Sequence, residues 1–406
     1  MERPNSELSL NAISSILTLR YNYDSKPRLP KLFWNDFQTT NSELSLEFIE
    51  NAITESMKNS IKEDTKKVSI SLSAGIDSTL MLALFKKEFP DIEINAISMR
   101  FADSTDETLQ ASKIAEYFGI EHHIIDLENF LIELPAAINI TKQPFWDLHW
   151  YHIVKKAKSL SNYLISGDGG DELFGGYTFR YQKYFSLISA SSDWNKKVEC
   201  YLRCHERDWV PDQEELFGTK IDFSWEKIHS ILKPYFDNPL PELEKIFLAD
   251  YNGKLLYNFS PVNSSFHDYF NINSIVPLLS KKIISYATHL DPRLKYDPEN
   301  NIGKIPLRKI LSKYIKNEFI NQKKQGFSVN TINLWKNYGF DLCEKYVING
   351  NICNDDWINK KWIKKYFKEN LQDVRYINKF LGLLAFEIWY RIFITKEMKP
   401  DTKLTA

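Results

Sequence analysis

Hydrophobic runs of two kinds alternate along residues 68 to about 180. Short β-branched and apolar runs are typical of buried strands, and between them lie segments with apolar residues at helical spacing. The strand-like runs are Val68–Leu72, Ile92–Met99, His122–Ile125 and Tyr163–Ile165, and the helical runs are Ser78–Lys87, Thr105–Phe118 and Trp150–Leu160. This alternation predicts an α/β fold, a parallel sheet with helices on both faces. Right-handed crossovers would bring the carboxyl ends of the strands to one edge.

The segments on either side of this region have a different pattern. The first forty residues are expected to be irregular, and a capping box at Thr40-Asn41-Ser42-Glu43 is expected to begin a helix. After about residue 180 the pattern becomes mostly helical. The expected helices there include Trp225–Tyr235, Lys282–His289, Leu307–Phe319 and Lys379–Ile392. We therefore divide the chain into an irregular N-terminal remnant or linker (1–40), a main domain (41–340) and a helical C-terminal extension (341–406), whose tail after Lys399 looks disposable.

The composition narrows the class of protein. The 406 residues carry a formal net charge of −1, so the overall charge indicates neither a nucleic-acid partner nor an anionic membrane surface. Four cysteines are too few for a disulfide framework, and neither an N-terminal signal nor an apolar run of about 18 residues is present. We expect a soluble, cytoplasmic protein that binds neither nucleic acid nor a membrane.

A short loop after the first strand has the features of a phosphate-binding turn. Residues 68–80 read VSISLSAGIDSTL, a strand followed by the loop 73–78 and a helix N-terminus, where backbone N–H groups and the helix dipole favour an anion. Gly75 lets the backbone approach phosphate oxygens, and Ser73 and Ser78 add hydroxyl donors. The lysine of a Walker A loop is absent. A carboxylate beside phosphates needs a cation between them, so Asp77 indicates a magnesium ligand.

A second glycine-rich loop follows about ninety residues later. Residues 166–177 read SGDGGDELFGGY, and the two loops together indicate a protein that binds ATP and cleaves it at the α-phosphate. Two structural alternatives remain open here. Asp171 and Glu172 are also the residues that favour a helix N-terminus, and Tyr177 is followed by Tyr181 and Tyr184 at helical spacing, which is typical of a core position.

These motifs resemble those of a known family. SAGIDS resembles the SGGxDS pyrophosphate loop of the ATP pyrophosphatases, and SGDGGDELFGGY resembles the SGEGxDExFGGY signature of the synthase domain of asparagine synthetases. Two further segments follow in the usual order and resemble the K-x-x-L-R and K-x-GF segments of that family, at residues 304–308 and 323–327. The resemblance covers roughly residues 65 to 340 and implies an adenine nucleotide alpha hydrolase-like fold.

The resemblance also implies roles for individual residues. The residues matching positions that bind the nucleotide are Ser73, Gly75, Asp77, Ser78, Ser166 and Gly167, with Met99 placed against the adenine or, equally, as an apolar strand end. The carboxylates matching the magnesium ligands are Asp77 and Asp171. Asp168 matches the acid that positions or deprotonates the nitrogen nucleophile. Tyr177 lies close to the intermediate, and Lys324 matches the lysine that neutralises charge on the carboxyl group and the α-phosphate.

The chain departs from the family pattern at several places. The N-terminal cysteine nucleophile of a glutaminase domain is absent, so we expect no glutamine hydrolysis by this chain. Ala74 replaces a glycine, which is tolerable at negative φ and costly otherwise, and Asp168 replaces the usual glutamate. Residues 273–280 keep the proline and apolar residues of the family's ExRxPFLD segment but lose both acids and the arginine, and Gln322 stands where an arginine is common. These losses put recognition of plain aspartate in doubt.

The sequence therefore predicts an ATP- and Mg²⁺-dependent ligase related to asparagine synthetase. A carboxylate, from aspartate or a related amino acid, would be adenylated with release of pyrophosphate, and ammonia or an amine would then displace AMP. The nitrogen would come from free ammonia, a separate glutaminase subunit or an amine substrate, and a homo-oligomer is compatible with the sequence. One alternative is an intramolecular amide- or lactam-forming synthetase, similar to β-lactam synthetases and lasso-peptide cyclases. Another is a nucleotide-binding partner protein that has lost turnover.

Overall fold

A computed structural model describes residues 10–40, 43–101, 106–205, 209–320 and 330–405. Its five strands form one parallel sheet in the order β3-β2-β1-β4-β5. The strands are β1 (Lys67–Ser71), β2 (Glu93–Phe101), β3 (Glu121–Leu127), β4 (Tyr163–Ile165) and β5 (Asn273–Ile275). The predicted α/β class and parallel sheet are confirmed, and the fifth strand, which the hydrophobic pattern did not predict, comes from a segment more than a hundred residues beyond β4.

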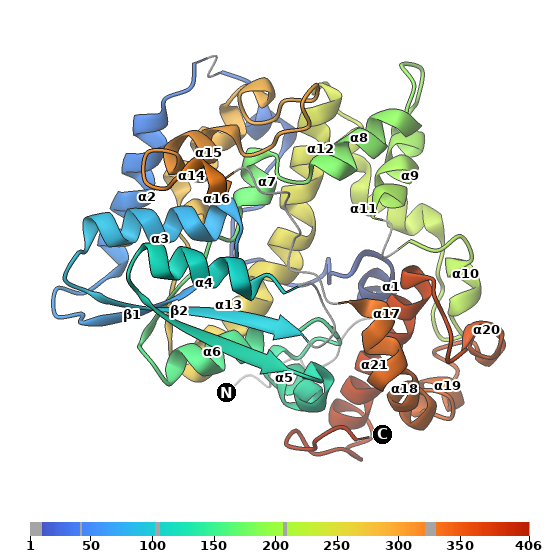
Figure 1. The fold of residues 1–406 in the computed structure, drawn as a ribbon. Coiled ribbons are helices and arrows are strands. Elements are labelled where there is room, and N and C mark those ends of the chain that lie inside the picture. The colour runs from blue at the N-terminus through green and yellow to red at the C-terminus, as the bar shows by residue number, and fades with distance from the viewer. Residues whose placement is uncertain (1–9, 41–42, 102–105, 206–208, 321–329, 406) are drawn as a thin grey trace, which may run out of the picture.

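Helices surround the sheet and extend well beyond it (Figure 1). The first six are α1 (Leu10–Leu19), α2 (Leu46–Ser60), α3 (Ile76–Glu88), α4 (Thr108–Tyr117), α5 (Leu134–Thr141) and α6 (Trp150–Lys158). The next seven are α7 (Gly170–Phe174), α8 (Thr178–Leu187), α9 (Trp194–Cys204), α10 (Gln213–Leu216), α11 (Trp225–Phe236), α12 (Glu242–Asp250) and α13 (Ser260–Phe270). The remaining helices are α14 (Lys281–His289), α15 (Ile305–Leu311), α16 (Asn317–Ile320), α17 (Thr331–Leu334), α18 (Phe340–Tyr346), α19 (Asn351–Asn354), α20 (Lys360–Tyr366) and α21 (Val374–Phe393).

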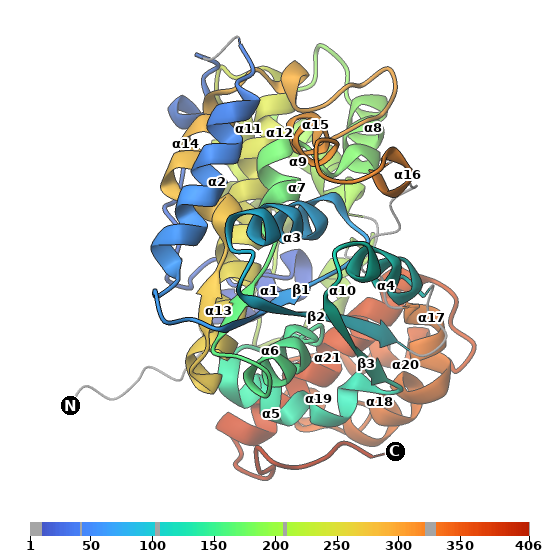
Figure 2. The same cartoon turned by 60° about the vertical axis from the view of Figure 1, so that its left-hand side comes forward.

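Both faces of the sheet are covered, as the near-continuous apolar strands require. Along β2, Ile94 and Ala96 join the hydrophobic cluster that contains the buried residues of α3. Ile97 and Met99 join the other cluster, with α6 and α21. This division follows from the alternation of side chains along a strand. Figure 2 shows α3 and α4 on one side of the sheet and α6 on the other.

The register of the strands brings the chemically interesting loops together. Ile70 pairs with Ile165 and Ile165 pairs with Ile275, so β1, β4 and β5 end at the same edge. The loop after β4 is tied to β5 because Ser166 N donates to Ile275 O over 3.0 Å. In parallel sheets this carboxyl edge is where ligands bind.

Four local expectations were wrong. The N-terminal segment is not irregular throughout: Ile13, Ile16 and Leu17 bury one face of α1 in the cluster that contains α21, whereas residues 20–33 have neither helix nor strand. The helix expected after Thr40 begins at Leu46, where the Ser45 hydroxyl accepts from Phe48 N over 3.2 Å. The single helix expected over 307–319 is broken: α15 ends at Leu311 in 3₁₀-type turns, and α16 begins at Asn317.

The C-terminal tail is the fourth wrong expectation. Leu404 is buried and its N–H donates to Ile132 O over 3.0 Å. Lys403 forms an ion pair with Glu133, and Lys345 Nζ donates to Thr405 O over 2.9 Å. The tail after Lys399 is therefore packed against the α5 and α18 region and is not disposable. The division of the chain at residue 340 stays a prediction.

Within the described ranges, no helix has both the length and the apolar character needed to cross a bilayer.

Candidate active site

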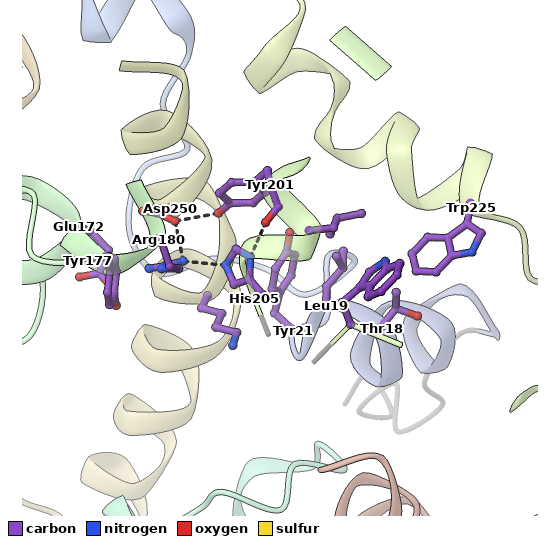
Figure 3. Close-up of a pocket in the computed structure, with 13 residues that line it drawn as sticks. Thr18, Leu19, Tyr21, Glu172, Tyr177, Arg180, Tyr201, His205, Trp225 and Asp250 are labelled. Carbon is purple, nitrogen blue, oxygen red and sulfur yellow. Dashed lines mark hydrogen bonds and ion pairs between the residues drawn. The ribbon is translucent and has the colours of Figure 1, made fainter. Parts of the chain in front are cut away.

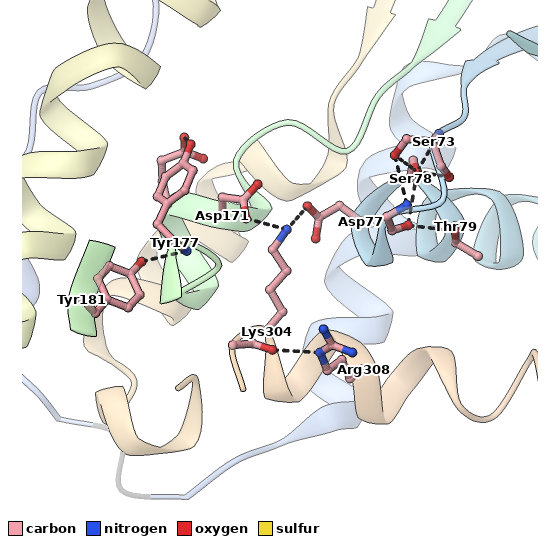
Figure 4. A network of polar contacts seen from close by, with 12 residues as sticks. Ser73, Asp77, Ser78, Thr79, Asp171, Tyr177, Tyr181, Lys304 and Arg308 are labelled. Carbon is pink, nitrogen blue, oxygen red and sulfur yellow. Dashed lines mark hydrogen bonds and ion pairs between the residues drawn. The ribbon is translucent and has the colours of Figure 1, made fainter. Parts of the chain in front are cut away.

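The first loop positions its serines at the start of α3. The helix begins directly after Gly75, and its first turn carries Asp77 and Ser78. The Ser78 hydroxyl accepts from Ser73 N over 3.1 Å and contacts the Ser73 hydroxyl over 3.0 Å, while Gly75 N donates to Ser73 Oγ over 3.1 Å (Figure 4). Two N–H groups of the loop, those of Ser73 and Gly75, are thus satisfied by its own hydroxyls. Ala74 is not among the described residues with positive φ, so its methyl group fits where the family has glycine.

The second loop packs directly against the first. A Cβ atom at Gly167 would lie 2.8 Å from Asp77 Cβ and 2.9 Å from Ser78 N, and one at Gly170 would overlap the Asp77 carboxylate. Real Cβ atoms essentially never approach so closely, so only glycine allows this contact. The two motifs, about ninety residues apart in sequence, therefore form one site.

Lys304 lies between the two predicted magnesium ligands. Its Nζ forms ion pairs with Asp77 and, over 2.8 Å, with Asp171 Oδ1, and its side chain is only 5 % exposed (Figure 4). Burial by itself would lower the pKa of Lys304, but the two carboxylates outweigh burial and raise that pKa. The Lys304 side chain is therefore protonated and carries a positive charge at neutral pH. Lys304 N also donates to Phe174 O over 2.9 Å, which ties the start of α15 to α7.

The residues present fit ATP with one magnesium ion. Among the described residues, no group of three or more His, Cys, Asp or Glu side chains could hold a metal by itself. Mg²⁺, however, is usually held by one or two carboxylates together with substrate phosphates. Asp77 and Asp171 already share one cation in this structure, at the edge where the glycine-rich loops meet. They are the residues that would hold the ion.

Asp168 lies half-buried beside this pair and has a polar partner that sequence reasoning missed. Its Oδ2 accepts from Asn263 Nδ2 of α13 over 3.1 Å. Burial raises the pKa of Asp168, the charge of Asp77 adds to that effect, and hydrogen bonds from Asn263 and Ser166 oppose it. A carboxylate with a raised pKa is better suited to accept a proton at neutral pH. No sequence signal connects Asn263 with the motif, because it comes from a distant helix.

The half-buried Tyr177 and the buried Glu172 form a second polar pair. Tyr177 Oη donates to Glu172 Oε1 over 2.5 Å, and the guanidinium of Arg180 lies 3.6 Å from the centre of the Tyr177 ring. Burial, aided by the charge of Asp171, raises the pKa of Glu172 to about 7. Burial also raises the pKa of Tyr177, so its hydroxyl stays protonated. Glu172 is thus a buried hydrogen-bond partner and does not merely favour a helix N-terminus.

Two of the predicted site residues are not placed with this cluster. Met99 lies inside β2, which continues to Phe101, and is buried in a hydrophobic cluster. Its predicted contact with adenine stays a prediction. Lys324, predicted to neutralise charge in the reaction, lies outside the described residues, as does Gln322. The structure thus brings together Ser73, Gly75, Asp77, Ser78, Ser166, Gly167, Asp168, Asp171 and Tyr177, whose roles stay predictions.

Comparison with known proteins agrees with these motifs. The model of the family described as asparagine synthase matches residues 49–391. The asparagine synthetase (glutamine-hydrolyzing) 1 of Bacillus subtilis (strain 168) is 24% identical over 392 residues, which cover 87% of this chain and 60% of that protein. A putative asparagine synthetase (glutamine-hydrolyzing) 2 of Methanocaldococcus jannaschii is 29% identical over 138 residues, 32% of this chain and 25% of that protein. The chain thus spans less than two thirds of the length of these relatives.

Among solved structures, an NMN synthetase from Francisella tularensis covers 50% of this chain and 92% of its own, with a TM-score of 0.26 and 18% identity. A likeness of that size supports no conclusion about function. The family match is different, because it extends over most of the chain and includes both glycine-rich loops and α15. This chain therefore belongs to the asparagine synthase family.

Proposed function

We propose that this protein forms amide bonds at the expense of ATP. In the first step a carboxylate oxygen of the substrate attacks the α-phosphorus of ATP, and the bond to the β-phosphate breaks to release pyrophosphate. In the second step ammonia or an amine attacks the acyl carbon, and AMP leaves. The observation that carries the proposal is the meeting of Asp77 and Asp171, from the two loops, around the ammonium group of Lys304.

The residues around this point suit the first step. N–H groups and hydroxyls of the first loop lie at the N-terminus of α3, where they would hold phosphate oxygens. Lys304 would stay paired with the carboxylates and add positive charge beside the departing pyrophosphate. A magnesium ion held by Asp77 and Asp171 would supply further charge neutralisation for the leaving group.

Asp168 suits the second step. An attacking ammonium group must lose a proton before its lone pair can reach the acyl carbon. The raised pKa of Asp168 lets it take that proton, and the bond from Asn263 fixes its orientation. The proton would pass from the nitrogen to a carboxylate oxygen of Asp168 while AMP departs with the former acyl–phosphate oxygen.

The experiment that tests the activation step is exchange of labelled pyrophosphate into ATP, measured with Mg²⁺ and with each of the twenty amino acids in turn. We expect one or a few amino acids to stimulate exchange. Asp77→Asn should abolish it, whereas Asp91→Asn should not, because Asp91 is exposed in the turn after α3. Without exchange for any carboxylate, a nucleotide-binding protein without turnover is the better reading.

An intramolecular reaction is a second candidate, favoured by the uncharged acceptor segment. Leu279 packs against the second loop at Gly169, and the exposed Asn273 at the start of β5 stands at the position of the first acid of the ExRxPFLD segment that residues 273–280 resemble. A substrate that supplies its own amine needs no site for free ammonia. Mass spectrometry distinguishes the candidates, because an intramolecular product has lost one water whether or not ammonium is added.

A further inference from the structure

A cavity lies beside the active site and takes part of its wall from the second loop. Its empty volume, which includes space open to the solvent, is about 540 Å³. Figure 3 shows Glu172 and Tyr177 at one end, Trp225 at the other, and Arg180 with Asp250 between them. The walls come from the end of α1 and the residues just after it, from α8, α9 and α12, and from the start of α11.

A buried ion pair forms the polar centre of this cavity. Arg180 Nη1 lies 2.9 Å from Asp250 Oδ1, and Tyr201 Oη donates to the same oxygen over 2.8 Å. The other oxygen, Asp250 Oδ2, is buried and has no hydrogen-bond partner among the described residues, although the Asp250 side chain is only 1% exposed. A buried carboxylate oxygen without a donor is costly, so a ligand that brings a donor to it would gain free energy.

The guanidinium group of Arg180 offers hydrogen-bond donors for an anionic group. Its recorded hydrogen bonds, to Asp250 and His205, both leave from Nη1, so among the described residues Nη2 and Nε donate to no other side chain. Lys254 adds a second cation to the lining. At the centre of the cavity, Asp250 Oδ2 can therefore accept from a cationic group, and the guanidinium of Arg180 can donate to an anionic group. The two side chains are as close as the partners of an ion pair.

The rest of the lining is aromatic and apolar. It includes Leu19, Tyr21, Leu202, Trp209 and Trp225. Such surfaces bind flat or branched hydrocarbon groups, and aromatic rings also stabilise a nearby ammonium group. A ligand that matches the carboxylate oxygen, the guanidinium group and the apolar wall must carry an ammonium group, a carboxylate close to it, and an apolar side chain.

We propose that this cavity binds an α-amino acid with an aromatic or large apolar side chain. The ammonium group contacts Asp250 Oδ2, the carboxylate contacts Arg180, and the side chain extends towards Trp225. The ligand would touch the Glu172–Tyr177 pair, and Glu172 directly follows Asp171 in the chain. The inference that the bound amino acid is a reactant rests on the proposed function, whereas the inference that it binds does not.

Calorimetric titration of the full chain without nucleotide tests the proposal. The probes are L-phenylalanine, L-tyrosine, L-tryptophan and L-leucine, each compared with L-aspartate. For L-phenylalanine two truncated analogues are added: 2-phenylethylamine, which lacks the carboxylate, and 3-phenylpropionate, which lacks the ammonium group. We expect at least one apolar amino acid to bind, and each truncated analogue of phenylalanine to bind at least about tenfold more weakly than phenylalanine itself.

Two tryptophans provide matched variants. Trp225 and Trp194 are the first residues of α11 and α9, both are half-buried, and Trp194 does not line the cavity. Trp225→Leu should weaken binding about tenfold, whereas Trp194→Leu should leave the dissociation constant unchanged. Asp250→Asn, if circular dichroism shows it folded, should weaken binding of the amino acid more than binding of 3-phenylpropionate.

The proposal is overturned if none of the four apolar amino acids binds, if both truncated analogues bind as tightly as phenylalanine, or if the two tryptophan variants behave alike. These results are separable from the proposed function. Pyrophosphate exchange by the same preparation reports on the ATP site, so a protein can fail one test and pass the other.

Discussion

Lys304 donates from its ammonium group to Asp77, although the two residues lie 227 positions apart in the chain. The same ammonium group lies 2.8 Å from Asp171 Oδ1. Three segments, the first loop, the second loop and the start of α15, are therefore joined at one cation. Removing a partner from a buried ion pair is costly because the charge left behind is not neutralised. The ion pairs of Lys304 should therefore contribute measurably to the free energy of unfolding before any ligand binds.

The first prediction concerns this lysine. Lys304→Gln should lower the free energy of unfolding by about 3 kcal/mol, since two carboxylates, 16% and 23% exposed, would face each other without a cation. Urea denaturation followed by circular dichroism measures the change. Adding MgCl₂ should restore part of the loss, because the divalent ion can replace the ammonium group between the carboxylates.

The control for this variant is Lys309→Gln, an exposed position on the same helix, which should change stability by no more than about 0.5 kcal/mol. Equal stability of Lys304→Gln and the unmodified chain would show that the ion pairs do not contribute.

The second prediction concerns pH. Burial, followed by the charge of Asp171, raises the pKa of Glu172 from an ordinary 4.5 to about 7. Between these values the folded protein keeps a proton that the unfolded chain has released, so stability falls as the pH rises through this range. The full difference corresponds to roughly 3 kcal/mol. Glu172→Gln keeps an acceptor for Tyr177 and should flatten this slope in urea denaturation between about pH 5 and about pH 8.

Glu63→Gln, at an exposed position, serves as the comparison and should retain the slope of the unmodified chain. A slope in Glu172→Gln as steep as in that comparison would mean that Glu172 titrates near its ordinary pKa.

The third prediction separates the two proposed chemical steps. Asp168→Asn cannot accept a proton but can still accept the hydrogen bond from Asn263. We expect it to retain pyrophosphate exchange while amide formation falls at least about a hundredfold, the usual contribution of general base catalysis. Asp168→Glu should recover most of that loss. Parallel loss of exchange and amide formation in Asp168→Asn would place Asp168 in the activation step instead.

The fourth prediction concerns the C-terminal tail. Deleting residues 403–406 removes the buried Leu404 side chain and its bond to Ile132 O. We expect the deletion to destabilise the protein by about 2 kcal/mol or more, and Leu404→Ala to account for most of the loss. Thermal unfolding checks both. Deleting Ala406 alone should have no effect, and a tail deletion that leaves the melting temperature unchanged would contradict the packing seen here.

The sheet and the two loops could be predicted because their signals are local. A β-branched run, a glycine-bearing turn and a helix start lie within a dozen residues around Gly75, so the sequence around that turn determines the geometry. Motif order then indicated that Asp77 and Asp171 would meet. The fifth strand was not predicted, because Asn273–Ile275 is short, has exposed polar residues, and becomes a strand only by pairing with β4.

What the sequence did not predict depends on contacts between distant segments. Lys304 was recognised as part of a motif, but its place between two carboxylates depends on how α15 packs against α7. Asp250 ends α12 and Asn263 lies in α13, and nothing in the sequence around them shows that they reach Arg180 and Asp168. The same holds for Leu404, which looks like part of a polar tail until Ile132 is placed beside it.

The serine hydroxyls of the first loop have a consequence for how tightly a nucleotide can be held. Because the Ser78 and Ser73 hydroxyls already accept from Ser73 N and Gly75 N, an incoming triphosphate would reach these two N–H groups only by trading existing partners for new ones. Its net gain is the difference between two sets of bonds, which tends to be small. We expect such a loop to release a bound nucleotide readily, which would favour turnover over very tight retention.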